Sequence, residues 1–189
     1  MAEKSNGIRF TSLFRPTEVI CRTEQTDRDV ILLNLLRLLE YQRRLDDVDE
    51  AYRAVLNREK EMSTVVAPGI AMPHARLDAF ENIVVGIVTS QNGIIYDKNR
   101  PDKLIKLIIL TLVPKNAPGA YLQAISSLAK ICQDPATADI VASLPIQEKV
   151  WSFFEQREMV ICDHLKASDI LKSVKAQLQE HDTLEKGHQ

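Results

Sequence analysis

Residues 103–113 read KLIKLIILTLV, and upstream of them residues 82–90 read NIVVGIVTS. Both stretches are apolar, rich in β-branched residues and too short to make convincing helices. A strand that is buried on both faces has such a continuous apolar run, because neither side of it meets water. The two stretches therefore predict buried strands of a sheet. Between them, IIYDKNRPDK (94–103) indicates a short strand and a charged turn.

Two helices are predicted before these strands. In residues 26–45, leucine and isoleucine recur at helical spacing and form one wide apolar stripe. Thr26 with Asp29 resembles a capping box at the start of this helix. The second helix begins at Asp46 or Asp47 and carries its apolar residues on one face.

Helical patterns return after the second strand, over residues 119–133, 135–143 and 145–156. Before the first strand, STVVAPGIAMPHA (63–75) mixes small and β-branched residues with two prolines, which is typical of a loop that leads into a short strand. Strands enclosed by helices at both ends of the sequence predict an α/β fold in which helices cover a sheet.

The sequence pattern changes at about residue 157. A short apolar run there resembles a strand, and Ser168 then caps a predicted helix. We therefore divide the chain into a main domain, residues 1–156, and a C-terminal helical extension, residues 157–189.

Composition excludes several classes of function. Of the 189 residues, 45% are hydrophobic and 26% are charged, as in an ordinary soluble globular protein. A formal net charge of −2 gives no electrostatic basis for binding nucleic acid. The first residues lack the apolar segment of a signal peptide, and the most apolar stretch is too short for membrane insertion and contains Lys106. The three cysteines lack metal-ligand spacing, so we expect a cytoplasmic protein with free thiols.

The stretch GIAMPHAR (69–76) carries the most distinctive chemistry. His74 follows a proline, and a neutral imidazole nitrogen is a nucleophile near neutral pH. Arg76 would point to the same side of an extended segment as His74, and Arg58 lies near a helix end shortly before the loop. Guanidinium groups repel a metal cation but suit a phosphate, because phosphoryl transfer depends on positive charge around the oxygens. A histidine that only caps a strand end is the alternative.

Other catalytic arrangements have less support in the sequence. It contains neither a Gly-x-Ser-x-Gly nucleophile elbow nor a glycine-rich phosphate loop. Catalysis by a cysteine and a histidine stays open, although no cysteine has local support. The remaining histidines, His164, His181 and His188, lie in or near the tail and are expected to be surface residues.

The stretch LNREKEMSTVVAPGIAMPHARL (56–77) resembles the enzyme IIA domain of the fructose/mannitol type, from the bacterial phosphoenolpyruvate-dependent sugar phosphotransferase system. Nitrogen-regulatory IIA proteins belong to the same family. The positions that match the family pattern are Arg58-Glu59, Ser63-Thr64, Gly69-Ile70-Ala71, Pro73-His74 and Arg76. The resemblance covers roughly residues 10–156 and leaves the tail outside it.

This resemblance implies a mixed β-sheet flanked by helices on both faces. It also implies that an HPr-like phosphocarrier protein phosphorylates His74 on a ring nitrogen and that Arg58 helps to hold the phosphoryl oxygens. The phosphoryl group would then pass to a IIB domain, or would persist as a mark that regulates a target protein. The chain would formally be a phosphotransferase component. No metal ion and no organic cofactor is implied.

Two departures from the family pattern bear on this role. Val65 and Ala67 stand where glycines are expected, and Pro68 follows them. Tyr121 stands where the family has a second histidine, which opens the helix after the last long strand. A tyrosine hydroxyl donates a hydrogen bond to a phosphoryl oxygen or to the ring of His74, but it does not become a cation at neutral pH. Simple packing of the Tyr121 ring explains the residue equally well.

Two functions therefore stay open. The intact Pro-His-Ala-Arg stretch and Arg58 favour a phosphocarrier whose transfer is retained but weakened. The altered loop and Tyr121 favour a IIA-derived module that binds a partner protein without phosphotransfer. A third interpretation is that the tail packs over the His74 surface and controls docking.

Overall fold

The computed structural model describes residues 9–78, 80–115 and 120–161, except for the side chains of residues 120–124 and 127. The elements before the central strands are η1 (Phe10–Ser12), η2 (Pro16–Glu18), β1 (Val19–Ile20), α1 (Arg28–Tyr41), α2 (Val48–Glu61), β2 (Val65–Ala67), β3 (Ile70–Ala71) and β4 (His74–Leu77). They are followed by β5 (Val84–Ile95), β6 (Leu104–Pro114), α3 (Ala120–Cys132) and α4 (Thr137–Ser143). A further helix covers residues 147–161.

The strands form one mixed sheet with the order β1-β5-β6-β3-β2, and β4 also pairs with β6. Strands β5 and β6 are antiparallel and make the longest pairing. Strands β3 and β4 both run parallel to β6 and pair with successive parts of it. The sheet thus has both parallel and antiparallel neighbours, as the family resemblance implied.

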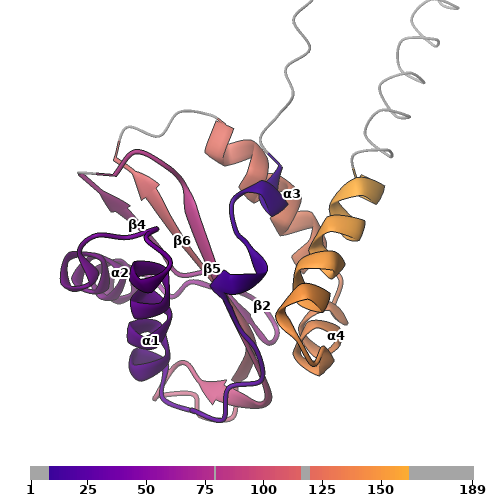
Figure 1. The fold of residues 1–189 in the computed structure, drawn as a ribbon. Helices are drawn as coiled ribbons and strands as arrows, with labels where there is room; N and C mark the ends of the chain where they lie inside the picture. The colour runs from indigo at the N-terminus through magenta and orange to yellow at the C-terminus, as the bar shows by residue number, and fades with distance from the viewer. Residues whose placement is uncertain (1–8, 79, 116–119, 162–189) are drawn as a thin grey trace, which may run out of the picture.

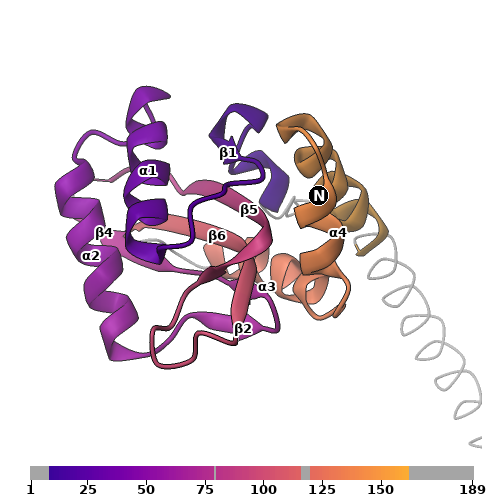
Figure 2. The ribbon, with the colours of Figure 1, turned by 90° about the horizontal axis from the view of Figure 1, so that it is seen from below.

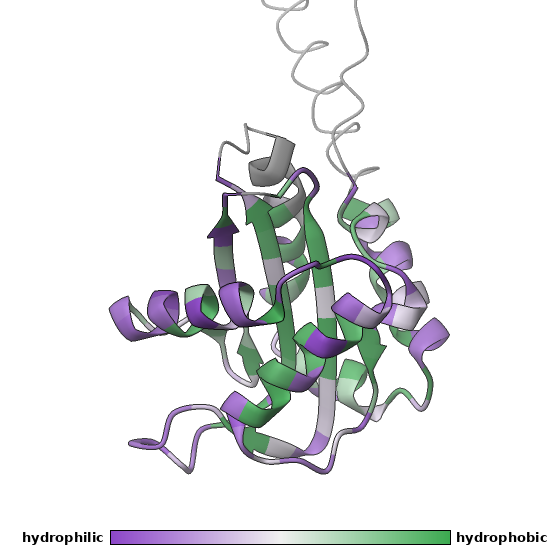
Figure 3. Cartoon of the chain, turned by 60° about the vertical axis from the view of Figure 1, so that its left-hand side comes forward, coloured by the Kyte–Doolittle hydropathy of each residue, from purple (hydrophilic) through white to green (hydrophobic). Residues whose placement is uncertain are grey.

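Helices cover both faces of this sheet. Figures 1 and 2 show α1 and α2 on one side, with α3, α4 and the C-terminal helix on the other. Alternate residues of the two long strands enter two separate hydrophobic clusters, so both strands are buried on both sides. Figure 3 shows the strands as mainly hydrophobic and the surrounding helices and loops as carrying the hydrophilic residues. The prediction of buried strands covered by helices is confirmed.

The prediction of a capping box at Thr26 is wrong by one residue. Asp27 is the N-cap of α1, and its carboxylate accepts hydrogen bonds from the backbone N–H groups of Asp29 (2.8 Å) and Val30 (3.2 Å). The backbone carbonyl of Thr26 instead accepts a hydrogen bond from the N–H of Ile95 at 2.9 Å. Thr26 therefore lies before the helix and bonds to the end of β5.

Two further predictions of local structure need correction. The short strand predicted around residues 94–95 is the end of β5, which continues past an irregularity between Thr89 and Ile94. Gly93 has a φ of +88° there, a conformation that glycine adopts without strain. The apolar run after residue 157 is helical up to residue 161, because a short apolar run alone does not separate a strand from a buried helix. The predicted helix capped by Ser168 lies outside the described residues.

The C-terminal helix is tied to the N-terminal segment by one buried carboxylate. Glu158 is 1% exposed, and it accepts hydrogen bonds from the backbone N–H groups of Phe10 and Thr11. The hydroxyl of Thr11 donates to the same carboxylate at 2.7 Å, and the indole N–H of Trp151 donates to the carbonyl of Thr11 at 3.3 Å. The helix therefore continues without a break across residues 156–158, where the sequence pattern changes, and Glu158 anchors this part of it to the N-terminal segment.

We expect Glu158→Ala to lower the free energy of unfolding by about 2 kcal/mol, because it leaves buried backbone N–H groups without an acceptor. Urea unfolding of the two proteins measures this difference. Glu148→Gln changes an exposed glutamate of the same helix and serves as the control. Equal unfolding midpoints for Glu158→Ala and the wild type would contradict the assignment of Glu158 as an anchor.

Candidate functional site

His74 is the first residue of β4, and its position follows from how this strand is paired. It lies opposite Thr111 of β6, whose backbone N–H donates to the carbonyl of Pro73 at 2.9 Å. Ala75 and Leu77 are buried in the cluster beneath α1 and α2. Since side chains alternate along a strand, His74 points to the other side and is only half-buried.

Two hydrogen bonds fix the ring of His74 in one neutral form. The Nδ1 atom lies 3.2 Å from the backbone carbonyl of Met72, and the Nε2 atom lies 3.2 Å from Nε of Arg58. A carbonyl only accepts and a guanidinium only donates, so Nδ1 carries the proton and Nε2 presents its lone pair. The nitrogen that is available as a nucleophile is therefore Nε2.

Arg58 contacts both the end of its own helix and the ring of His74. It lies in the last turn of α2, and its Nη1 donates to the carbonyl of Met62 at 3.0 Å, which satisfies a backbone group at the helix end. Its Nε donates to His74 from the same position. The helix end thus sets where the guanidinium meets the imidazole.

The other two predicted site residues differ in how far the structure describes them. Arg76 is exposed and lies on the same side of β4 as His74, as its spacing predicted. Among the described residues it has no ion-pair partner. Tyr121 lies in the first turn of α3, and its side chain is outside the described part of the chain. The tail histidines lie outside it as well.

A buried hydrogen-bond network adjoins the Arg58–His74 pair. The hydroxyl of Tyr96, which is 2% exposed, donates to Glu59 at 3.1 Å and lies 2.9 Å from the hydroxyl of Thr64. Both the hydroxyl and the backbone N–H of Thr64 also donate to Glu59. Burial raises the pKa of Tyr96 far above its ordinary value, so its hydroxyl remains a donor to the carboxylate.

This network reaches both nitrogens of the His74 ring. Glu59 follows Arg58 directly in α2, and Arg58 bonds to Nε2. The carbonyl of Thr64 accepts from the N–H of Met72 at 2.9 Å, and the carbonyl of Met72 accepts from Nδ1. The sequence included Glu59 and Thr64 only as matches to a family pattern and did not single out Tyr96, because an aromatic residue after a strand usually indicates packing.

The described cysteines are not placed as nucleophiles. Burial raises the pKa of the Cys132 thiol to about 12, and burial also raises the pKa of Cys21. A thiol with such a pKa remains protonated and weakly reactive at neutral pH.

Within residues 9–78, 80–115 and 120–161, no group of three or more His, Cys, Asp or Glu side chains could hold a metal ion. In the same residues, every helix is too short or too polar to cross a membrane.

Two curated relatives share part of this sequence. The chain is 40% identical over 87 residues to a PTS system fructose-specific EIIA component of Haloferax volcanii, a match that covers 46% of this chain and 56% of that protein. It is 28% identical over 110 residues to a nitrogen regulatory protein of Escherichia coli K12, which covers 57% of this chain and 66% of that protein. The chain thus spans less than two thirds of the length of either relative.

Solved structures share the fold. The nitrogen regulatory protein IIA-Ntr of Neisseria meningitidis matches with a TM-score of 0.68 at 22% identity, over 76% of this chain and 97% of that one. Enzyme IIA mannitol of Escherichia coli, solved in complex with phosphorylated enzyme IIB mannitol, matches with a TM-score of 0.61 at 17% identity, over 76% of this chain and 97% of that one. At these identities the likeness establishes the fold.

Residues 12–157 match the family described as phosphoenolpyruvate-dependent sugar phosphotransferase system, EIIA 2, which is almost the same segment that the motif resemblance covered. The sheet, the Pro-His stretch at the start of β4 and the neighbouring arginine all lie within it. The chain belongs to the EIIA 2 family of the phosphoenolpyruvate-dependent sugar phosphotransferase system.

Proposed function

We propose that this chain is a phosphocarrier that accepts a phosphoryl group on Nε2 of His74 from an HPr-like protein. It then passes the group to a IIB partner, or keeps it as a mark that a regulated target protein reads. The observation that carries the proposal is the pair of hydrogen bonds, each 3.2 Å long, that leaves Nε2 as the basic nitrogen beside a guanidinium. The proposal places the chain in the cytoplasm, where its phosphoryl donor is made.

In the proposed step, Nε2 attacks the phosphorus atom of the donor phosphohistidine. A new N–P bond forms as the donor's N–P bond breaks, and the donor nitrogen keeps the electron pair. Nδ1 of His74 retains its proton, so the phosphorylated ring carries a positive charge. The carbonyl of Met72, which accepts from Nδ1, stabilises that charge.

Arg58 has to change partner during this step. The lone pair that accepts its Nε–H is the pair that attacks phosphorus, so the guanidinium moves from the ring nitrogen to the phosphoryl oxygens. Its Nη1 bond to the carbonyl of Met62 keeps the side chain close to the ring. Positive charge at the oxygens is the main contribution that a protein makes to phosphoryl transfer.

The exposed residues near Arg58 suit docking of a protein partner. Met62 and Val66 are 65% and 54% exposed, and they flank the segment that contains Thr64. Large apolar side chains in such positions are frequent at protein interfaces. The Escherichia coli enzyme IIA mannitol with the same fold was solved with its phosphorylated IIB partner, which supports a IIB-type partner here.

The second candidate function is a regulatory module that binds a partner without phosphotransfer. Tyr121 supplies no cation where the family has a second histidine. Val65 and Ala67 belong to β2 and pair with β3, so this segment is a strand and not an open glycine loop around a phosphate. Both features weaken phosphoryl binding and leave the docking surface in place.

We expect incubation with phosphoenolpyruvate, enzyme I and an HPr-type carrier to add one phosphoryl group to the wild type and none to His74→Ala. Intact-protein mass spectrometry under alkaline conditions measures the added mass, since phosphohistidine is labile to acid. The His164→Ala variant, altered in the tail, is the matched control and should be phosphorylated normally. Unmodified wild type beside a second acceptor that is phosphorylated by the same donor would favour the binding module.

We expect Arg58→Lys to slow phosphorylation of His74 by about 100-fold, because one preorganised donor at the transferring group contributes about that much. A lysine lacks the planar fork that holds the helix end and faces the ring at the same time. Rapid-quench kinetics with the phosphorylated carrier measures the rate. Arg53→Lys, in the same helix, is the control, and equal rates for all three proteins would show that Arg58 only caps the helix.

We expect Tyr121→His to raise the phosphorylation rate by about ten-fold. A charge-assisted hydrogen bond to a phosphoryl oxygen is stronger than a neutral one by about 1 kcal/mol, which corresponds to roughly that factor. The gain should disappear at alkaline pH, where the introduced imidazole is neutral. A rate that stays at the wild-type value at pH 6 would indicate that residue 121 does not face the phosphoryl group.

A further inference from the structure

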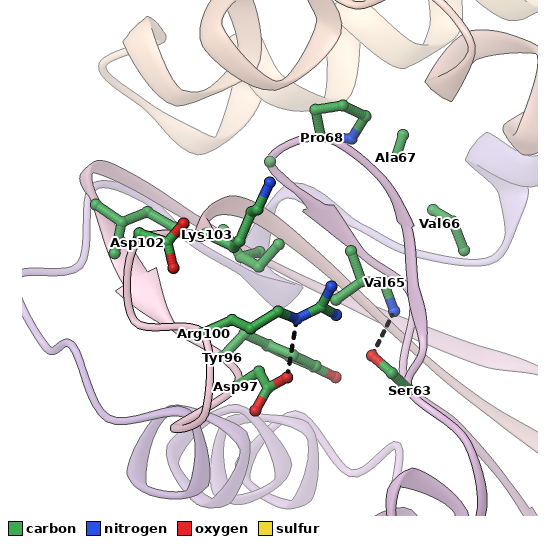
Figure 4. A pocket seen from close by; sticks show the side chains of 13 residues that line it. Ser63, Val65, Val66, Ala67, Pro68, Tyr96, Asp97, Arg100, Asp102 and Lys103 are labelled. Atoms are coloured by element: carbon green, nitrogen blue, oxygen red, sulfur yellow. Dashed lines mark hydrogen bonds and ion pairs between the residues drawn. The ribbon is translucent and has the colours of Figure 1, made fainter.

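A pocket of about 520 Å³ lies between the segment around β2 and the connection from β5 to β6. Figure 4 shows it with Val65, Ala67 and Pro68 along one wall. Leu104 and Ile105, at the start of β6, add further apolar surface. His74 does not line this pocket, whose size is ordinary for a site that encloses a small organic molecule.

Two cationic side chains supply the polar part of the pocket. Nε of Arg100 donates to Asp97 at 3.2 Å, and Figure 4 shows the rest of the guanidinium directed across the pocket toward Val65. Lys103 also extends into the pocket, and it has no ion-pair partner among the described residues. The terminal nitrogens of Arg100 and the ammonium of Lys103 are therefore donors without a protein acceptor.

Asp97 offsets part of the charge of Arg100, whereas Lys103 has no ion-pair partner among the described residues. Asp97 is engaged by Arg100 and by the backbone N–H of Asn99 at 2.9 Å, and the latter bond contributes most to a pKa below its ordinary value. Asp102 lies beyond Lys103, on the side away from Val65 (Figure 4). The part of the pocket between Lys103 and Val65 thus combines cationic donors with an apolar wall.

The inner wall of the pocket is connected to the phosphorylation site. Tyr96 lines the pocket, and its hydroxyl bonds to Glu59 and Thr64. Thr64 lies between Ser63 and Val65, which both line the pocket. The carbonyl of Thr64 accepts a hydrogen bond from the N–H of Met72, and the carbonyl of Met72 accepts one from Nδ1 of His74. A molecule in the pocket therefore contacts Tyr96 and both sequence neighbours of Thr64, which belong to or flank the network that leads to the ring of His74.

We propose that this pocket binds a small organic anion with an apolar body, and that its occupancy accelerates phosphorylation of His74. The anionic group binds Arg100 and Lys103, and the apolar body packs against Val65, Ala67 and Leu104. The second half of this inference rests on the proposed function, whereas the binding site stands without it. Acceleration is the expected direction because a ligand fixes the segment around Thr64 and so holds Nδ1 and Nε2 in their productive roles.

Titration of the isotope-labelled full chain with phenyl phosphate, benzoate, benzamide and inorganic phosphate tests the binding site by NMR. We expect the two aromatic anions to shift the backbone amides of residues 65–69 and 103–105. Benzamide, which lacks the charge, and inorganic phosphate, which lacks the apolar body, should bind at least about ten-fold more weakly. Comparing phenyl phosphate with benzoate identifies the preferred anionic group.

The double variant Arg100→Gln, Lys103→Gln should lose binding of both aromatic anions and keep the amide spectrum of a folded protein. Lys98→Gln is the matched control, because Lys98 is an exposed lysine of the same connection that lies outside the pocket. Absence of binding by both aromatic anions would overturn the site. Equal binding of benzamide, or unchanged binding by the double variant, would overturn the assigned role of the two cations.

The coupling is tested with whichever aromatic anion binds more tightly, at saturation. We expect the phosphorylation rate of His74 to rise by about five-fold, at the lower end of ordinary coupling between sites. In Tyr96→Phe the anion should still bind but should no longer change the phosphorylation rate. Glu59→Gln alters the same network and should give the same result. An unchanged wild-type rate at saturation would overturn the coupling. A wild type that accepts no phosphoryl group would instead refute the proposed function, and the NMR titration would still decide the binding site.

Discussion

The parallel pairing of β4 with β6 is the constraint on which the geometry of the site depends. Strand β4 has only four residues, but its partner is buried on both faces and paired along both edges. A shift of one residue in register would place His74 in the core and expose Ala75 and Leu77. The hydrophobic contacts of those two residues therefore hold the imidazole on the accessible side of the strand.

The end of α2 supplies the second half of the site. Arg58 satisfies a carbonyl of its own helix end and meets His74 from that fixed point. Glu59, the next residue, directs its carboxylate into the network with Thr64 and Tyr96. One helix terminus thus positions a cation at the ring and a half-buried carboxylate next to it, so the place where α2 ends sets the geometry of the candidate site.

The sequence predicted the elements that depend on long apolar patterns. The two long strands and the two N-terminal helices are as expected, whereas His74 begins β4 and does not end a strand. Features decided by single contacts were not predictable in the same way. Aspartate and threonine both suit an N-cap, so the sequence did not separate Asp27 from Thr26. Asp27 caps α1 because the backbone carbonyl of Thr26 bonds to the end of β5.

Contacts between distant segments account for the rest of what the sequence did not reveal. Glu158 bonds to residues almost 150 positions earlier, so nothing local distinguished it from an ordinary helix surface glutamate. Tyr96 joins the network only because the folding of β5 against β6 brings it to Glu59 and Thr64. The pocket beside it is formed by two connections that the sequence indicated only as a loop and a charged turn.

The segment before His74 keeps one glycine of the expected motif and has other residues at two positions where the resemblance places glycines. Gly69 is retained, and it has a φ of +75°, while a Cβ at this position would lie 2.9 Å from Cβ of Ala138 in α4. Val65 and Ala67 face no such constraint, and as side chains of β2 they form the apolar wall of the pocket. Glycines at those two positions would remove the apolar side chains that line this side of the pocket. The residues that stand where the motif resemblance places glycines therefore form the apolar wall of the pocket that we propose as a binding site.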